Sequence, residues 1–272
     1  MTTIVVWKTF EIERWLGNPA IWIISDSRAT IKKGYEKQTL TNRCAKVFEV
    51  DIVVRNGDEV LRSAMLIAIS GSATVAHNTI FCVQLALKYL KGESIPTALE
   101  LAKYVRDVIL DITKEVALSI DKNAMCEAII AARDGPEIKV YSLESHIKTD
   151  HIDYSIEEVC EFPYVIGIDK DKYEKKFLEE LKKNKKTNNE ITDQNTIYIF
   201  DKIFVEEGSS QETGGELHIA AIGSCHVHTY RAMRWNKSAE MYEFYLFGMD
   251  TFDKKIGNSV IVMNPWQLED KN

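Results

Sequence analysis

The first side chain able to act as a nucleophile belongs to Thr2, which follows Met1. Methionine aminopeptidases ordinarily remove an initiator methionine that precedes a small residue such as threonine. A hydroxyl is a weak nucleophile that needs an adjacent base. The α-amino group of an N-terminal threonine has a pKa of about 7.7 to 8.0, so it can accept the proton of its own hydroxyl. Thr2 could therefore supply both the nucleophile and the base for amide hydrolysis.

Such a site needs charges that tune the amine and donors that stabilise an oxyanion. A lysine ammonium beside the amine lowers its pKa, and an aspartate can hold that lysine in place. Five later segments carry residues of these kinds. They are Ser25-Asp26-Ser27-Arg28-Ala29-Thr30, Lys46-Val47, Ile69-Ser70-Gly71-Ser72-Ala73, Ile219-Ala220-Ala221-Ile222-Gly223-Ser224 and Asp253-Lys254-Lys255-Ile256-Gly257-Asn258-Ser259-Val260.

In this order the segments resemble those of proteasome β subunits, a family of N-terminal-nucleophile (Ntn) threonine peptidases. The opening Thr2-Thr3-Ile4-Val5 resembles the start of the bacterial two-ring protease that works with an AAA+ unfoldase. The resemblance implies that Thr2 is the nucleophile, that Lys46 tunes its amine and that Asp26 orients Lys46. It also implies that the Gly71 N–H stabilises the oxyanion.

The resemblance further implies an outer network around the Thr2 amine. Ser224 and Asp253 would belong to this network, while Arg28, Gly223 and Gly257 would support the turns. One position departs from the family, because Ile256 stands where the family has a serine.

Each motif also has a structural interpretation. The turn at Asp26 fits a salt-bridged loop, Lys46 a solvated strand end, Gly71 an entry to a helix, and Gly223-Ser224 a helix N-cap.

No metal or cofactor is expected. The run Cys225-His226-Val227-His228, with His218 nearby, has ligand chemistry suited to zinc but matches no standard zinc spacing. The basic run Lys182 to Lys186 is flanked by acidic residues, which is typical of a solvated face.

The segments that must position these residues begin with strands. The apolar runs TTIVVW and AIWIIS predict a hairpin, and Asn56-Gly57 between two β-rich runs predicts another. The pattern changes at Ser72 and predicts a first helix, and a second is expected from Pro96 to Ile120. A further hairpin is expected around the turn Asp134-Gly135-Pro136.

The later part of the chain is less regular. A charged insertion is expected at about 145–215, partly helical, within a single domain of residues 1–272. ELHIAAIGS predicts a strand, and NSVIVMNPW predicts a last strand. Between them, short helices are predicted for HVHTYRAMRW and AEMYEFYLFGM. This order predicts an α+β fold of two sheets between helical layers, and the resemblance implies the four-layer αββα Ntn-hydrolase sandwich.

The composition excludes several classes of protein. The 272 residues carry a formal net charge of -7, which argues against a nucleic-acid-binding groove. Five widely spaced cysteines favour free thiols, and neither a signal peptide nor a membrane-spanning run is evident. We expect a cytoplasmic protein with no nucleic-acid or membrane partner.

The combined expectation is a threonine-type amide or peptide hydrolase that acts through a Thr2 acyl-enzyme. The resemblance implies a homo-oligomeric ring, a peptide substrate and an ATP-dependent unfoldase partner. Two alternatives stay open. One is a catalytically silent subunit that serves as scaffold or binding protein, favoured by Ile256, and the other is a small-molecule amidohydrolase, which Thr2 disfavours.

Overall fold

The protein is described from a computed structural model, which has a mixed α+β architecture dominated by strands. The α+β class expected from the sequence is confirmed. The structure describes residues 2–9, 20–33, 36–41, 44–119, 124–148, 151–168, 170–187, 203, 215, 217–224, 226–230, 232–236, 241–246, 249–250, 255–256 and 259–260.

A five-stranded antiparallel sheet contains the N-terminal strand. Its order is β11-β1-β2-β12-β13. The strands are β1 (Thr3–Thr9), β2 (Ala20–Asp26), β11 (Tyr164–Gly167), β12 (Leu217–Ile222) and β13 (Val227–Tyr230). The predicted pairing of the first two apolar runs is confirmed, with Ile4 opposite Ser25 and Thr9 opposite Ala20.

A six-stranded sheet has the order β10-β9-β8-β6-β5-β7. Its strands are β5 (Val47–Asn56), β6 (Glu59–Gly71), β7 (Leu90–Lys91), β8 (Cys126–Asp134), β9 (Glu137–Lys148) and β10 (His151–Glu158). The predicted hairpins β5–β6 and β8–β9 are confirmed, and Gly57 and Gly135 turn them with positive φ angles of 59° and 61°.

Three helices accompany the sheets within the described part of the chain. They are α1 (Ala73–Leu87), α2 (Ala98–Ser119) and α3 (Lys170–Thr187). Ser72 caps α1, since its side chain accepts a hydrogen bond from the Val75 N–H at 3.5 Å. Both long helices expected from the sequence are thus confirmed. No helix in the described ranges is long and apolar enough to cross a membrane.

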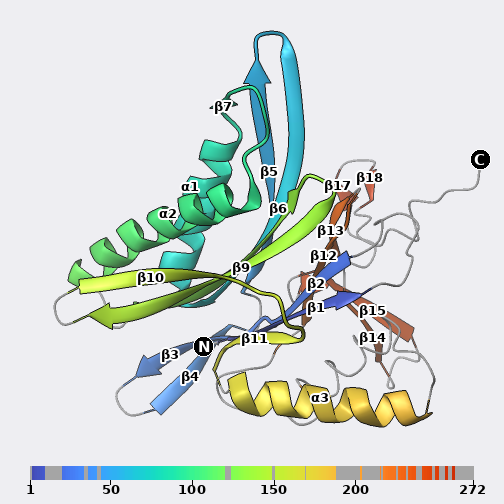
Figure 1. Ribbon diagram of the computed structural model, residues 1–272. Coiled ribbons are helices and arrows are strands. Elements are labelled where there is room, and N and C mark those ends of the chain that lie inside the picture. Colours follow the sequence, from blue (N-terminus) through green and yellow to red (C-terminus); the bar gives the residue numbers. More distant parts are fainter. Residues whose placement is uncertain are drawn as a thin grey trace, which may run out of the picture.

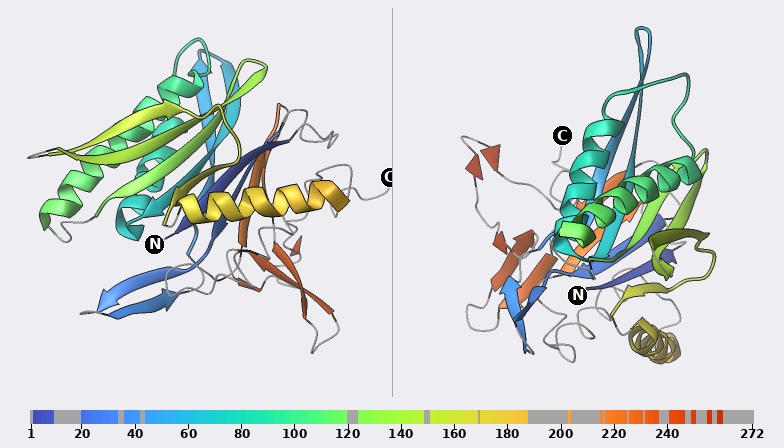
Figure 2. Two further views of the ribbon diagram at one scale, coloured as in Figure 1. Left: turned by 60° about the horizontal axis from the view of Figure 1, so that its bottom comes forward. Right: turned by 90° about the vertical axis from the view of Figure 1, so that its left-hand side faces the viewer.

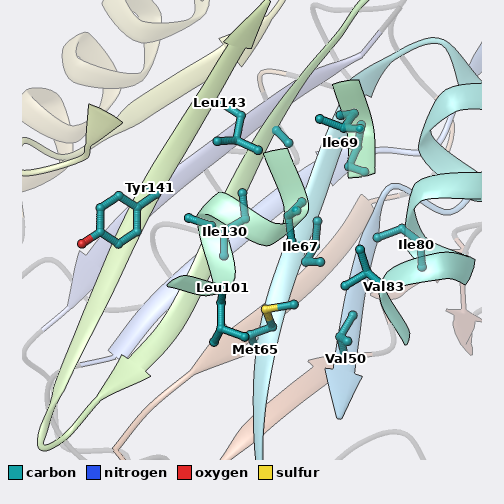
Figure 3. Close-up of a cluster of buried hydrophobic side chains, with 14 of the residues drawn as sticks. Val50, Met65, Ile67, Ile69, Ile80, Val83, Leu101, Ile130, Tyr141 and Leu143 are labelled. Atoms are coloured by element: carbon teal, nitrogen blue, oxygen red, sulfur yellow. The ribbon is translucent and has the colours of Figure 1, made fainter. Parts of the chain in front are cut away.

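Three groups of buried side chains hold these elements together. One group lies between α1, α2 and the six-stranded sheet, and Figure 3 shows Leu101 of α2 with Ile67 and Ile130 of the sheet. A second group lies between the two sheets and includes Ile4 and Leu66.

The third group covers the other face of the five-stranded sheet. There Tyr173 and Phe177 of α3 pack with Val5 and Trp7 of β1. Helices α1 and α2 therefore lie on one side of the strands and α3 on the other (Figure 1; Figure 2). Because neighbouring residues of β1 enter different groups, both faces of this strand are covered.

Smaller hairpins complete the described structure. They are β3 (Ala29–Lys33) with β4 (Glu36–Thr41), β14 (Ala232–Asn236) with β15 (Met241–Leu246) and β16 (Met249–Asp250), and β17 (Lys255–Ile256) with β18 (Ser259–Val260). The short helices predicted at 226–235 and 239–249 are wrong, because β13, β14 and β15 occupy these stretches. Val, Thr, Tyr, Trp and Phe residues, which these stretches contain, favour strands. Pairing with neighbouring strands therefore outweighed the helix-like spacing of the apolar residues.

The charged stretch from about 145 to 215 contains regular elements. It includes the end of β9, strand β10, strand β11 and helix α3. Of these, β11 pairs with β1, so this stretch contributes a strand directly beside the N-terminal strand.

Candidate active site

Thr2 lies at the edge of the space between the two sheets, immediately before β1. It is buried, with 3% of its surface exposed. Its carbonyl oxygen accepts a hydrogen bond from the Ser70 hydroxyl at 2.9 Å and another from the Ile168 N–H at 3.1 Å. Elements distant in sequence therefore fix the backbone of the candidate nucleophile from two directions.

Asp26 ends β2 beside the start of β1. One carboxylate oxygen, Oδ1, accepts the Thr3 N–H at 3.2 Å, while Oδ2 accepts the Arg28 N–H at 3.1 Å. The second bond reaches a residue two positions on, as in an Asx-turn. The backbone N–H of Arg28 thus closes this turn.

Lys46 is the ionic partner of Asp26. The two side chains are 3.0 Å apart and are exposed by only 5% and 1%. The Lys46 ammonium also donates to the Arg28 carbonyl at 2.6 Å. Burial lowers the pKa of Lys46, although the attraction of Asp26 opposes that shift. The structure thus brings Asp26, Arg28 and Lys46 together beside the segment that contains Thr2.

His218 is a neighbour of this pair that sequence reasoning did not place in the site. It lies opposite Ser25 in the β12–β2 pairing, and its Nδ1 accepts the Lys46 backbone N–H at 3.3 Å. Burial, with the nearby Lys46 charge, lowers the pKa of His218 to about 3. A neutral imidazole therefore adjoins the lysine. Its position within the apolar run LHIAAI was the available signal.

Gly71 ends β6, one residue after the Ser70 that binds Thr2. Its φ of 121° favours glycine, and an added Cβ would collide with the Met125 carbonyl and lie 2.8 Å from the Cys126 Cα. The glycine therefore allows β6 and β8 to approach closely where α1 begins. Gly71 also directly follows the residue whose hydroxyl binds the Thr2 carbonyl.

Gly223 and Ser224 lie away from Thr2. Strand β12 runs antiparallel to β2, with Leu217 opposite Asp26 and Ile222 opposite Ile21. Ser224 therefore follows the end of β12 that is remote from Asp26, about 20 Å along the strand at roughly 3.3 Å per residue. The expectation that Ser224 adjoins the Thr2 amine is not met, because β12 begins opposite Asp26 and runs away from it.

Strand β11 occupies the expected place instead. It pairs antiparallel with β1, with Val6 opposite Tyr164 and Thr3 opposite Gly167, and so runs toward Thr2. The Thr3 hydroxyl donates to the Ile168 carbonyl at 3.2 Å. The signal in the sequence was an apolar run that ends in glycine just before a helix.

Two predicted site residues, Asp253 and Gly257, lie outside the described residues. Cys225, one of the possible zinc ligands, does so too. Among the described residues, no group of three or more His, Cys, Asp or Glu side chains could hold a metal ion.

Comparisons with known proteins support the fold. No protein-family model and no curated protein matches the chain. Among solved structures it is similar to Anbu (ancestral beta-subunit) from Yersinia bercovieri, with 12% identity, 81% of each chain covered and a TM-score of 0.50. It is also similar to an Anbu (Gly-1) mutant from Hyphomicrobium sp. strain MC1, with 14% identity, 84% of this chain and 85% of that chain covered and a TM-score of 0.53.

These matches correct the family assignment made from sequence motifs. The findings support a proteasome-like fold whose structural neighbours are Anbu, and the assignment to proteasome β subunits and the two-ring protease is wrong. The motifs failed because each describes a local turn, and such turns follow from the fold rather than from one family. At 12% and 14% identity, the likeness establishes the fold alone.

Proposed function

We propose that this protein is a threonine-type amide or peptide hydrolase whose nucleophile is Thr2 after removal of Met1. The observation that carries the proposal is the buried ion pair of Asp26 and Lys46, joined through the Thr3 N–H to the backbone of the Thr2 segment. Burying an ammonium group costs desolvation free energy. Residues whose pKa is shifted by burial and by a charged partner cluster at functional sites.

The proposed reaction begins with the free α-amine of Thr2, which accepts the proton of the Thr2 hydroxyl. The oxygen attacks the substrate carbonyl, and the Gly71 N–H stabilises the oxyanion. The protonated amine then gives its proton to the leaving amine, which leaves an acyl-enzyme that water hydrolyses. Lys46 lowers the pKa of the Thr2 amine by its charge, and Asp26 orients Lys46.

The wider architecture is part of the proposal. We propose a single domain of residues 1–272, with the segment at about 145–215 as its insertion, and a four-layer αββα arrangement. The order of layers would be α1 and α2, the six-stranded sheet, the five-stranded sheet, and α3. Three separate core groups support this order. Asp253 and Gly257 retain their proposed roles near the site.

A cytoplasmic homo-oligomeric ring is proposed for the assembled protein. Helix α1 supports it, since Phe81 and Leu85 on its outer face are 65% and 51% exposed and Tyr89 just beyond is 72% exposed. Large apolar side chains gathered on one face are typical of contact surfaces. An ATP-dependent unfoldase partner stays a prediction from the sequence.

Intact mass spectrometry tests the catalytic proposal. The wild-type protein should lack Met1 and gain the mass of one epoxyketone or β-lactone probe, whereas Thr2→Ala should gain none. Thr2→Ser, which keeps a hydroxyl and an amine, should still be labelled. A wild-type protein that retains Met1 or stays unlabelled would contradict the hydrolase.

The second candidate function is a catalytically silent scaffold or binding subunit. The placement of Ser224 at the remote end of β12 favours it, because the polar residue expected beside the amine is not there. A stable oligomer with no labelling of Thr2 would support this alternative. Mass photometry of the same samples provides the oligomeric state.

A further inference from the structure

Glu127 has no role in the reaction described so far, yet it lies beside the Thr2 segment. It belongs to β8 and faces Ser70 across the β6–β8 pairing. Ser70 is the residue whose hydroxyl binds the Thr2 carbonyl. The half-buried Glu127 carboxylate, through Oε2, accepts the Gly167 N–H at 2.7 Å. A hydrogen bond to a carboxylate is shorter and stronger than one between neutral groups.

Gly167 passes this restraint directly to Thr2. Its φ is 98°, and a Cβ at this position would overlap the Thr2 carbonyl oxygen and lie 2.9 Å from the Ser70 hydroxyl. The next residue, Ile168, donates its N–H to the same Thr2 carbonyl at 3.1 Å. A shift of this turn therefore displaces the backbone of Thr2.

Glu127 belongs to a wider group of charged side chains. Lys170, at the start of α3, lies 3.6 Å from the Glu144 carboxylate. The pKa of Lys170 is raised chiefly by Glu144, and Glu127 adds to the rise. Tyr164 donates its hydroxyl to Glu144 at 3.4 Å. The carboxylates of β8 and β9 thus contact both ends of the segment that joins β11 to α3.

We propose that Glu127 is a positioning residue for the Thr2 nucleophile. Its carboxylate fixes the Gly167–Ile168 turn, and this turn fixes the Thr2 carbonyl. The fixed backbone keeps the Thr2 hydroxyl in position to attack a bound amide. The proposal rests on the proposed hydrolase function. It predicts that removing the Glu127 carboxylate from the Gly167 N–H slows the chemical step and leaves binding of the probe unchanged.

Two measurements on the full-length protein test it. The first is hydrogen exchange, followed by mass spectrometry, of peptides that cover residues 2–9 and 164–168. The second is the rate of labelling by a β-lactone probe, separated into kinact and KI. The variants are Glu127→Ala, Glu127→Asp and Glu127→Gln. Glu137→Ala is the matched control, because Glu137 lies in the adjoining strand with its side chain 70% exposed.

Glu127→Ala should speed exchange in both peptides and lower kinact about 10- to 100-fold, since a misplacement near 1 Å can cost about 100-fold in rate. KI should stay within about twofold of the wild type. Glu127→Asp, whose carboxylate is withdrawn by one methylene, should behave like Glu127→Ala. Glu127→Gln keeps an acceptor oxygen at the same reach and should retain at least about a third of kinact.

The outcomes separate this proposal from the hydrolase proposal. If wild-type protein is not labelled, the hydrolase proposal fails, and the exchange data alone decide whether Glu127 holds the turn. Unchanged exchange in both peptides for Glu127→Asp and Glu127→Ala overturns the positioning role. So does a loss of labelling that arises from KI, or an equal loss in Glu137→Ala. If Glu127→Ala does not fold, the contrast between Glu127→Asp and Glu127→Gln decides.

Discussion

Removal of one partner from the buried pair of Asp26 and Lys46 should destabilise the fold strongly and unequally. The side chains are 3.0 Å apart and exposed by 1% and 5%, so solvent screens their interaction little. Breaking a buried ion pair by removing one partner costs about 3 to 5 kcal/mol, because the other charge is left without compensation. We therefore expect a loss in this range from either single substitution.

The contacts of each partner predict which substitution is worse. In Lys46→Met, the Asp26 carboxylate keeps the N–H groups of Thr3 and Arg28, which stabilise its charge. We expect a loss near 3 kcal/mol, at the lower end of the range. In Asp26→Asn, the Lys46 ammonium keeps the neutral carbonyl of Arg28 but loses its counter-charge, so we expect a loss near 5 kcal/mol.

Urea denaturation of the wild type, both single variants and the double variant provides the measurement. Because the double variant buries neither charge, its loss should be smaller than the sum of the two single losses by about 1 to 3 kcal/mol. The m-values should be unchanged, which shows that the unfolded states are comparable. A loss below about 1 kcal/mol in Asp26→Asn, as for exposed pairs, or strict additivity would refute this reasoning.

Three further predictions concern neighbouring residues. His218 has a pKa of about 3 in the folded protein and about 6.5 when unfolded, so between these values the unfolded chain binds the extra proton. Stability is then lost as pH falls below 6.5, and from pH 7 to pH 5 the wild type should lose about 2 kcal/mol more than His218→Gln in urea denaturation. Ser224→Ala should leave the rate of probe labelling within about twofold of the wild type, since Ser224 is remote from Thr2; a tenfold loss would place the serine in the site. Gly71→Ala should lower the free energy of unfolding by about 1 to 3 kcal/mol, because alanine strains a φ of 121°, and an unchanged Tm would contradict this.

Much of the fold followed from local patterns in the sequence. Hydrophobic periodicity, turn residues and a helix cap each act over a few positions. Such local signals mark the β1–β2, β5–β6 and β8–β9 hairpins and the two long helices. The stretches after residue 225 were misassigned because their aromatic residues fit either period, and only pairing with another strand decides between them.

The candidate site was predictable where it depends on turns and was missed where it depends on strand direction. Asp26 and Gly71 are the last residues of β2 and β6, and Lys46 immediately precedes β5, so each lies at a strand end that local sequence signals mark. Ser224 carries the expected Gly-Ser motif, but the direction of β12 removes it from Thr2. The segment that replaces it, Gly167–Ile168, is marked only by an apolar run that ends in glycine, and its place depends on pairing with β1.

The position of β1 has a consequence during synthesis of the chain. Strand β1 lies between β2 and β11, so the N-terminal strand waits for a partner that is translated much later. At roughly 5 to 20 residues per second, the roughly 155 residues between β1 and β11 take on the order of ten seconds or more to make. For that interval Thr2 lacks the Ile168 N–H that its carbonyl accepts in the folded protein. Thr2 is buried in the folded protein, so the removal of Met1 that the proposed function requires would have to precede the pairing of β11 with β1.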